Sequence, residues 1–483
     1  MTQTYGNYID GEWSEATTGE TFENRSPSNT DELIGRYQRS SEEDAVAAVE
    51  AAAAAADEWA DMPAPERGRI LERTSRLLAD RKDELTETLS REEGKTLDEA
   101  SGEVQRAVDI FQYYAAKARD LGGTVKSPSS PDQNLYTVKE PLGVAALITP
   151  WNYPIAIPAW KIAPALATGN TVVFKPASLT PEIARNLVEC LNEAGLPDGV
   201  LNYVTGSGSE VGGVFTTHED VDAVSFTGSA KVGDHVYQSA TGDQKRVQLE
   251  MGSKNPAVVM PSADLDEAVD IVAAGAFGVT GQACTATSRA LVHESVYDEF
   301  VDRIVDRAEE IEIGPGMENP DMGPHASRDE LESTLEYVSL GSDEGATLLT
   351  GGERFSGDGL DDGHYVEPAV FADVEPEMRI AREEIFGPVL SVIPISSLDD
   401  AIEVANDVDF GLSASIVTDD LREANRFVEE AEVGVAKVNE KTTGLELHVP
   451  FGGVKGSSSE TFREQGDAAI DFYTLPKTVY MSY

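Results

Sequence analysis

Val144-Ala145-Ala146-Leu147-Ile148 is the first of three short apolar runs, and the next two are Thr171-Val172-Val173-Phe174-Lys175 and Val200-Leu201-Asn202-Tyr203-Val204. Residues 158–168 and 181–194, between these runs, are typical of helices. Short apolar strands that alternate with helices favour a parallel sheet covered on both faces. We therefore predict an α/β fold with a doubly wound dinucleotide-binding domain, whose ligand lies at the carboxyl ends of the strands.

Cys284 is one of two cysteines and lies within Phe277-Gly278-Val279-Thr280-Gly281-Gln282-Ala283-Cys284-Thr285-Ala286-Thr287-Ser288-Arg289. A free cysteine is commonly a small buried hydrophobic residue, and we interpret Cys190, on an amphipathic helix, in that way. The neighbours of Cys284 are small and hydroxylic instead. Gly281 permits a close backbone approach, and we expect the amides after the sulfur to begin a helix that favours a thiolate. Cys284 is the candidate nucleophile, with a structural cysteine as the alternative.

Glu250 ends a strand-like run in the segment Leu249-Glu250-Met251-Gly252-Ser253-Lys254-Asn255-Pro256. A thiolate nucleophile needs a partner that moves protons and activates water, and a glutamate of suitable pKa does both. Taken alone, a glutamate before a turn would be interpreted as an ordinary surface residue. Cys284 and Glu250 together indicate acyl-enzyme chemistry.

The chain has 483 residues, which is more than one hydrophobic core serves, so we expect two or three domains. Apolar residues make up 40% and charged residues 26%, as in soluble globular proteins. The net charge of −50 would repel phosphate and disfavours nucleic acid as a partner. Because salt screens self-repulsion, we predict a halophilic protein from a high-salt cytoplasm, with a strongly solvated surface as the simpler interpretation.

Two cysteines do not make a disulfide framework, which favours a reducing compartment. The first residues, Met1 to Gly6, contain no basic region followed by an apolar core, and no apolar run reaches membrane-spanning length. Six scattered histidines lack the spacing of metal ligands. We therefore expect a cytoplasmic protein that uses neither a membrane nor a metal.

The segments around Cys284 and Glu250 resemble the two active-site signatures of the aldehyde dehydrogenase superfamily, and further matches follow along almost the whole chain. Met251 and Ser253 stand where the family often has Leu and Gly. Thr149-Pro150-Trp151-Asn152-Tyr153-Pro154 resembles another family motif. By this resemblance Asn152 donates to the oxyanion together with the Cys284 amide, and Trp151 borders the cofactor. Turn chemistry alone would let Asn152 merely end a strand.

The resemblance also implies cofactor contacts. Thr227-Gly228-Ser229 follows a strand and precedes a helix, so its amides and hydroxyl suit a pyrophosphate at Gly228 and Ser229. The glycines of Gly206-Ser207-Gly208-Ser209-Glu210-Val211-Gly212 have the wrong spacing for a dinucleotide fingerprint. Glu384 corresponds to the acid that holds the nicotinamide ribose, and Phe386 to the aromatic against the ring; without the resemblance, Glu384 would be solvated surface.

Lys175 corresponds to the lysine that meets the adenosine ribose in the family, where the third residue after it is often a glutamate. Here that residue is Ser178. Because no carboxylate then repels a 2′-phosphate, we predict acceptance of NADP and a preference for it, with NAD still usable. Glu464 matches a glutamate thought to relay protons from the general base.

The resemblance divides the chain into three parts. Residues 1–121 and 141–251 would form the dinucleotide-binding domain, and 252–440 the α/β catalytic domain. Residues 122–140 and 460–483 would form a small bridging β-sheet for a homodimer or homotetramer.

Gln282 to Arg289 and the Met251-to-Pro256 segment are similar to the version in dehydrogenases of 2-oxoglutarate semialdehyde (2,5-dioxopentanoate). The expected reaction is oxidation of a small polar aldehyde through a cysteine thiohemiacetal and thioester. Succinate semialdehyde or another small aldehyde is the alternative substrate. A CoA-acylating enzyme and a non-catalytic binding or structural member of the fold are further alternatives, against which Glu250 and the intact set of Cys284, Glu250 and Asn152 argue. No carboxylate anchor is evident, and Arg289 is either that anchor or structural.

Overall fold

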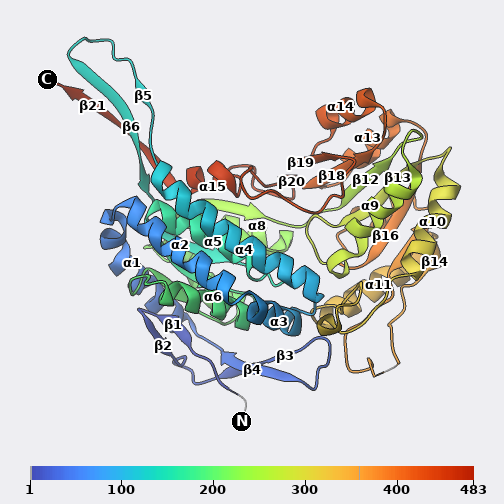
Figure 1. Cartoon of the computed structure of the whole chain (residues 1–483), viewed down its shortest axis with the longest axis horizontal. Coiled ribbons are helices and arrows are strands. Elements are labelled where there is room, and N and C mark those ends of the chain that lie inside the picture. The colour runs from blue at the N-terminus through green and yellow to red at the C-terminus, as the bar shows by residue number, and fades with distance from the viewer. Residues whose placement is uncertain (1–2, 358) are drawn as a thin grey trace.

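The computed structural model describes residues 3–357 and 359–483. Two seven-stranded sheets organise the described chain, and three smaller sheets accompany them (Figure 1). The first large sheet has the order β11-β10-β7-β8-β9-β1-β2, and the second has the order β14-β15-β16-β13-β12-β18-β19. Most neighbours in both sheets run parallel, and antiparallel strands occur only at the edges. The predicted α/β fold class is confirmed.

The first sheet is built from the predicted strands, because β7 (Val144–Ile148), β8 (Thr171–Lys175) and β9 (Leu201–Tyr203) are the three apolar runs. The other strands of this sheet are β10 (Ala223–Thr227), β11 (Arg246–Glu250), β1 (Asn7–Ile9) and β2 (Glu12–Ser14). Residues of β7 alternate between two cores: Ala145 and Leu147 face one, whereas Val144, Ala146 and Ile148 face the other. Both faces of the sheet are therefore covered by helices.

One face is covered by α2 (Ala64–Asp80), α3 (Lys82–Glu93), α4 (Leu97–Lys117), α5 (Ala156–Thr168) and α6 (Pro181–Glu193). The other face carries α1 (Glu42–Asp61), α7 (Gly213–Thr217) and α8 (Ala230–Thr241). All thirteen residues of α5 are buried, since α2 and α4 lie over it. The N-terminus of α5 follows β7 directly and therefore lies at the carboxyl edge of the sheet.

The second large sheet positions Cys284. Its strands are β12 (Asn255–Val259), β13 (Thr287–His293), β14 (Thr347–Thr350), β15 (Ala369–Ala372), β16 (Val389–Ile395), β18 (Ser413–Val417) and β19 (Val435–Val438). Its helices are α9 (Leu265–Phe277), α10 (Tyr297–Glu309), α11 (Arg328–Glu344), α12 (Arg379–Arg382), α13 (Leu398–Asn406) and α14 (Leu421–Glu430). Cys284 lies just before β13, so it faces the first sheet across the boundary between the two parts.

A hairpin arm projects from the body and carries the C-terminus (Figure 1). It consists of β5 (Val125–Lys126), β6 (Gln133–Pro141) and β21 (Thr474–Ser482), and β6 pairs with β21 along its whole length. Its exposed apolar side chains are Val125, Leu475, Tyr480, Met481 and Tyr483. The remaining elements are β3 (Thr21–Arg25) with β4 (Leu33–Gln38), β17 (Phe410–Gly411) with β20 (Val454–Lys455), and α15 (Gly466–Phe472).

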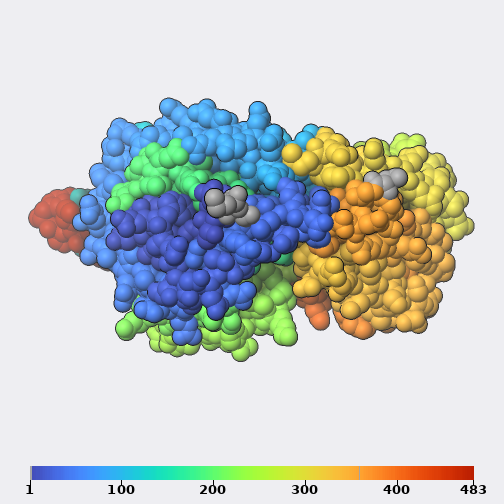
Figure 2. Space-filling model, turned by 90° about the horizontal axis from the view of Figure 1, so that it is seen from below, coloured from blue at the N-terminus to red at the C-terminus, as the bar shows by residue number. Residues whose placement is uncertain are grey.

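The two large parts also meet near the N-terminus, where the segment between β3 and β4 contacts residues 362–364 (Figure 2). The Thr30 amide donates to the Asp362 carbonyl at 2.9 Å, and the His364 amide donates to the Pro27 carbonyl at 3.0 Å. Within the described ranges, no helix combines the length and apolarity that a membrane crossing requires.

Candidate active site

A cavity of about 190 Å³ lies where the carboxyl ends of the first sheet meet the second part of the chain. It brings together residues that are far apart in sequence. Its lining consists of Pro150, Trp151, Asn152, Ile157, Thr227, Gly228, Ser229, Met251, Gly252, Cys284, Glu330, Glu384 and Phe386. Seven of these are predicted site residues, and they come from four separate segments.

Cys284 is partly exposed in this cavity. Burial, followed by the charges of Glu384, Glu250 and Glu464, raises the pKa of its thiol to about 12. The predicted helix start after the sulfur is wrong, because residues 283–286 form a turn that leads into β13. Asn255 holds this turn by donating to the carbonyls of Cys284 at 2.9 Å and of Ala286 at 2.8 Å. The thiol is therefore protonated at neutral pH in this state.

The backbone before Cys284 has an unusual conformation. Val279, Thr280 and Gly281 have φ angles of +52°, +55° and +66°, in the left-handed region that β-branched residues avoid. A Cβ on Gly281 would lie 2.7 Å from the Pro388 nitrogen, so the sequence has a glycine at this close approach. The predicted close approach at Gly281 is thus a contact with the backbone of residues 387 and 388.

Asn152 is buried at the start of the loop that leads into α5. Its side-chain amide donates to the Gln282 carbonyl at 2.9 Å, which places it beside the cysteine turn. An asparagine amide carries two N–H groups, and this bond uses one of them. The second is available to an oxygen in the cavity.

Glu250 ends β11 but does not line the cavity. Its carboxyl group accepts from the Gly453 amide at 3.2 Å and from the Ser458 hydroxyl at 3.4 Å. A Cβ at Gly452 would collide with this carboxyl group, so the glycine leaves the space that Glu250 occupies. Burial and the charge of Glu464 raise the pKa of Glu250 well above its ordinary value. Glu250 is thus a carboxyl group of raised proton affinity that is turned toward residues 452–458.

Glu464 is buried, and one of its oxygens accepts from the ammonium group of Lys161 on α5. Its other oxygen has no hydrogen-bond partner in the described part of the chain. Lys161 also donates to Ser225 at 2.7 Å, and Ser225 donates to Gln248 at 2.9 Å. A buried polar chain therefore reaches from Glu464 into the centre of the first sheet.

The turn Thr227-Gly228-Ser229 links β10 to α8 and lines the cavity. Ser229 is the N-cap residue of α8, and its hydroxyl makes no capping bond. The α8 N-terminus therefore presents free amides and a hydroxyl, which suit a phosphate group. The glycine cluster at residues 206–212 does not contribute to this cavity.

Glu384 and Phe386 form the opposite wall. Glu384 accepts from the Ser253 amide at 2.8 Å, and burial raises its pKa to about 7. Gly252 permits this approach, since a Cβ there would lie 2.5 Å from the Glu384 carboxyl carbon. The rings of Trp151 and Phe386 meet edge to face with centroids 5.5 Å apart. A carboxyl group and two aromatic rings thus frame the space in front of Cys284.

Lys175 and Ser178 lie outside this cavity: Lys175 is the last residue of β8, and Ser178 follows it in the next loop. The Lys175 ammonium group donates to the Pro176 carbonyl at 3.0 Å, and burial lowers its pKa to about 8. Ser178 is exposed. Lys175 has no carboxylate partner among the described residues.

Arg289 is structural. Its guanidinium group is buried and donates to the carbonyls of Lys254, Val404 and Ala405, the last two at the end of α13. It therefore caps a helix and is not free to bind a substrate.

Our sequence predictions gave no role to six cavity residues: Pro150, Ile157, Thr227, Met251, Gly252 and Glu330. Thr227 and Met251 are next to predicted residues in the sequence, and this position could have identified them as cavity residues. Glu330 lies in the first turn of α11, and nothing in its local sequence distinguishes it from the many exposed glutamates.

Comparison with known proteins gives consistent matches. The model of the aldehyde dehydrogenase family matches residues 13–479. The α-ketoglutarate semialdehyde dehydrogenase of Haloferax volcanii is 62% identical over 483 residues, covering 100% of both chains. The α-ketoglutaric semialdehyde dehydrogenase of Bacillus subtilis is 44% identical over 479 residues, covering 99% of this chain and 98% of the relative. The structure of betaine aldehyde dehydrogenase from Staphylococcus aureus in complex with NAD+ is similar, with a TM-score of 0.96 and 35% identity, covering 99% of this chain and 94% of that chain.

Proposed function

The chain belongs to the aldehyde dehydrogenase family, and from this premise we propose that it oxidises 2-oxoglutarate semialdehyde to 2-oxoglutarate with a nicotinamide dinucleotide. The observation that carries the proposal is the meeting of Cys284, Asn152 and Glu384 in one cavity. The substrate follows from two relatives named for this semialdehyde, which this chain matches over 99% or more of its length. Succinate semialdehyde is the second candidate, because it also joins an aldehyde to a carboxylate.

The first step is the attack of Cys284 on the aldehyde. Because the pKa of the thiol is raised to about 12, the sulfur must lose its proton as it attacks, and Glu250 is the group we assign to receive it. The oxygen of the thiohemiacetal then accepts from the free N–H of Asn152 and from the Cys284 amide. Donors fixed at such an oxygen are commonly worth about two to three powers of ten in rate.

A bound nicotinamide dinucleotide supplies the hydride acceptor, and the residues present fit it. The Ser229 amide and hydroxyl, beside Gly228, would hold the pyrophosphate, and the Glu384 carboxylate would hold the nicotinamide ribose. Trp151 and Phe386 would exclude water beside the ring. Glu384 accepts hydrogen bonds from both ribose hydroxyls most strongly when it is ionised, and its pKa of about 7 makes that form available at neutral pH.

The second step is hydrolysis of the thioester on Cys284. Glu250 activates the water, and for this its carboxyl group must leave Gly453 and Ser458 and turn toward the sulfur. Glu464 and Lys161 offer the released proton a buried route away from the site. A general base that activates water favours hydrolysis over transfer of the acyl group to CoA.

Lys175 and Ser178 support the use of NADP. Ser178 presents no carboxylate, and the Lys175 ammonium group, which burial makes easy to deprotonate, would be stabilised by a 2′-phosphate. We therefore propose that NADP is preferred and that NAD is still accepted.

Arg106 on α4 is our candidate for the substrate carboxylate. Its guanidinium group is half-buried and donates to the Gln465 side chain at 3.0 Å, next to Glu464. Burial lowers its pKa, and Glu446 and Asp109 act on it only as through-space charges. Arg106 forms no ion pair with a carboxylate of the described chain, although that chain is rich in acids. A small carboxylate would provide the missing partner.

The exposed apolar side chains of the hairpin arm support self-association, and we propose a homodimer or homotetramer in which a second copy covers the arm. This assigns residues 122–140 and 460–483 to assembly, residues 1–121 and 141–251 to dinucleotide binding, and residues 252–440 to catalysis.

The test is an assay at high salt of 2-oxoglutarate semialdehyde, succinate semialdehyde and propanal, each with NAD and NADP, with the product identified by mass spectrometry. The expected result is the highest kcat/KM for 2-oxoglutarate semialdehyde with NADP. A higher value for succinate semialdehyde would assign the second substrate, and a higher value with NAD would refute the cofactor preference. A product that forms only when CoA is added would refute hydrolysis.

A further inference from the structure

Lys95, two residues before α4, contacts the residue that we assign to the oxyanion. Its ammonium group is almost fully buried and lies 2.7 Å from the Asn152 carbonyl and 2.7 Å from Glu103. It also lies over the ring of Tyr153, 4.4 Å from the centroid. Lys95 therefore fixes the peptide group of Asn152, whose side chain reaches the cavity.

Glu103, nearly two turns into α4, extends these contacts. Its second oxygen accepts from the amides of Ile155 at 3.0 Å and Ala156 at 3.1 Å, the first turn of α5. The loop that carries Asn152 is thus held at its beginning by Lys95 and at its end by Glu103. The two holding groups form a buried ion pair with each other.

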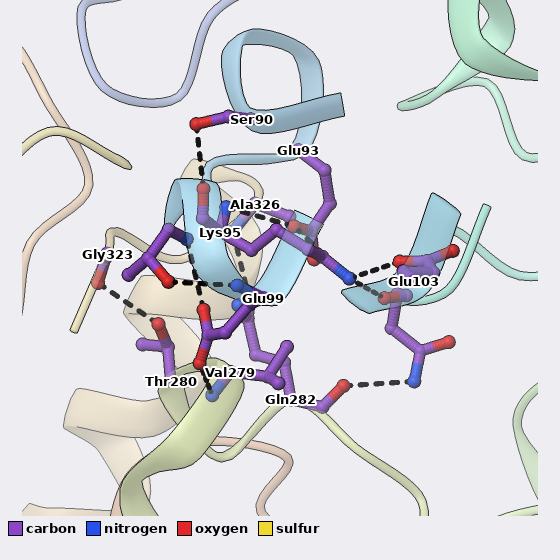
Figure 3. A network of polar contacts seen from close by, with 12 residues as sticks. Ser90, Glu93, Lys95, Glu99, Glu103, Val279, Thr280, Gln282, Gly323 and Ala326 are labelled. Atoms are coloured by element: carbon purple, nitrogen blue, oxygen red, sulfur yellow. Dashed lines mark hydrogen bonds and ion pairs between the residues drawn. The ribbon is translucent and has the colours of Figure 1, made fainter. Parts of the chain in front are cut away.

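Glu99, also on α4, holds the other side of the site (Figure 3). One of its oxygens accepts from the Val279 amide at 2.6 Å, and the other accepts from the Thr96 amide at 3.0 Å in the capping box of the helix. Val279 begins the left-handed backbone before Cys284, which a β-branched residue adopts only when its surroundings enforce it. Glu99 provides part of that enforcement.

Further hydrogen bonds hold the left-handed segment at residues 279–281 and the residue after it. The Thr280 hydroxyl donates to the Gly323 carbonyl at 3.0 Å, and the Gln282 side chain accepts from the Ala326 amide at 3.0 Å (Figure 3). Gln282 also supplies the carbonyl that receives the Asn152 side chain. The two sides of the site therefore meet at Gln282.

We propose that the N-terminal end of α4, through Lys95 and Glu99, is a positioning device that sets Asn152 and the Cys284 amide at the distance required by one oxyanion. The two donors belong to segments on opposite sides of the boundary between the large sheets, and a single helix end contacts both. An error of about 1 Å in such an alignment commonly costs on the order of a hundredfold in rate. The proposal rests on the roles given above to Asn152 and Cys284.

The first test is a double-mutant cycle on the full-length enzyme, read as the pre-steady-state burst of reduced cofactor with propanal. Lys95→Met should slow the burst by at least about tenfold in the native enzyme and by less than about threefold in the Asn152→Ala background, because Lys95 acts through Asn152. An equal loss in both backgrounds would overturn the proposal. A wild-type enzyme that reduces no cofactor with any of the aldehydes would instead refute the proposed function.

Matched controls separate positioning from folding. Lys245→Met removes another buried lysine that donates to a backbone carbonyl, that of Val221 at 2.9 Å, and it should leave the burst unchanged. If Lys95→Met does not fold because Glu103 loses its partner, Lys95→Met with Glu103→Gln preserves the charge balance and is tested in the same cycle. An unchanged burst in this double variant would overturn the role of Lys95.

The second test examines Glu99. Glu99→Ala should slow the burst by at least about tenfold, whereas Glu99→Gln, which keeps an acceptor for the Val279 amide, should stay within about threefold of wild type. Glu92 is the control, since it accepts from the amides of Glu182 and Ile183 at the start of α6, away from the cavity. Equal burst losses in Glu99→Ala and Glu92→Ala would identify Glu99 as merely structural.

Discussion

Gly233 in the first turns of α8 controls how closely this helix approaches the end of β11. A Cβ at position 233 would lie 2.9 Å from the Met251 Cγ, closer still to the Met251 sulfur, and 3.4 Å from the Phe226 ring. Relative to an ordinary contact of 3.4 Å, the Cγ alone requires a displacement of 0.5 Å (3.4 − 2.9). Gly233→Ala therefore either shifts α8 or moves Met251 into the cavity that it lines.

The expected magnitudes follow from two opposing terms. Alanine in a helix interior is favoured over glycine by about 1 kcal/mol, whereas overpacking a filled core costs about 1–3 kcal/mol. The net change is a loss of about 1 kcal/mol in the free energy of unfolding. Because the same shift moves the Ser229 amide and hydroxyl, the Kd of the cofactor should rise about tenfold, which corresponds to about 1.4 kcal/mol.

The assay is isothermal titration with NADP together with thermal unfolding of Gly233→Ala. Gly102→Ala is the matched control, since Gly102 lies inside α4 with no atom within 4 Å of its added Cβ. The control should raise the Tm and leave the Kd unchanged. If Gly233→Ala also raises the Tm and binds the cofactor normally, the reasoning about the α8 approach is refuted.

Four further predictions follow from the site and the surface. Glu250→Gln should slow the burst of reduced cofactor and lower kcat by about 10²-fold or more, because thiol attack and deacylation both lose their base; normal steady-state turnover would contradict this role. Arg106→Gln should raise the KM for 2-oxoglutarate semialdehyde by about tenfold and leave propanal oxidation unchanged, and an equal effect of the exposed Arg119→Gln would argue against a carboxylate contact. Because burial raises the pKa of Glu384 to about 7, its carboxyl group binds protons more tightly when folded; below pH 7 the cofactor Kd should rise, and Glu384→Gln should weaken binding and remove this pH dependence. Raising KCl from about 0.1 to 1 M shortens the Debye length from about 10 to 3 Å, so the Tm of a chain with a net charge of −50 should rise, and a constant Tm would exclude a need for salt.

The strands and the turn that surround this site could be predicted from the sequence, because each depends on the composition of a short segment. The apolar runs at β7, β8 and β9 pair in parallel as their composition indicates. The turn at Gly228 and Ser229 leads from a strand into a helix, and this order is visible in the sequence. Parallel strands end at a common edge, so the positions of Asn152 and Ser229 beside the same cavity follow from the topology.

The orientation of side chains depends on distant parts of the chain and could not be predicted in the same way. Glu250 turns away from the cavity because the Gly453 amide and the Ser458 hydroxyl hold its carboxyl group. Our expectation of a helix after Cys284 failed because Asn255 holds those residues in a turn. Arg289 lies next to the cysteine segment in sequence, yet its guanidinium group caps α13.

The pKa values of Cys284, Glu250 and Glu384 are all raised, and together they bear on when the thiolate can form. The charges of Glu384 and Glu250 both raise the pKa of the Cys284 thiol, so each ionised carboxylate makes the thiolate more costly. If both carboxylates were ionised together with the thiolate, three negative charges would face one another with little solvent. A cationic nicotinamide ring beside Cys284 would lower this cost, so we expect the thiolate to form more readily once the cofactor has bound. Without cofactor, the thiol should therefore react slowly with iodoacetamide at neutral pH; a rapid reaction of the free enzyme would show that the buried carboxyl groups do not control the cysteine.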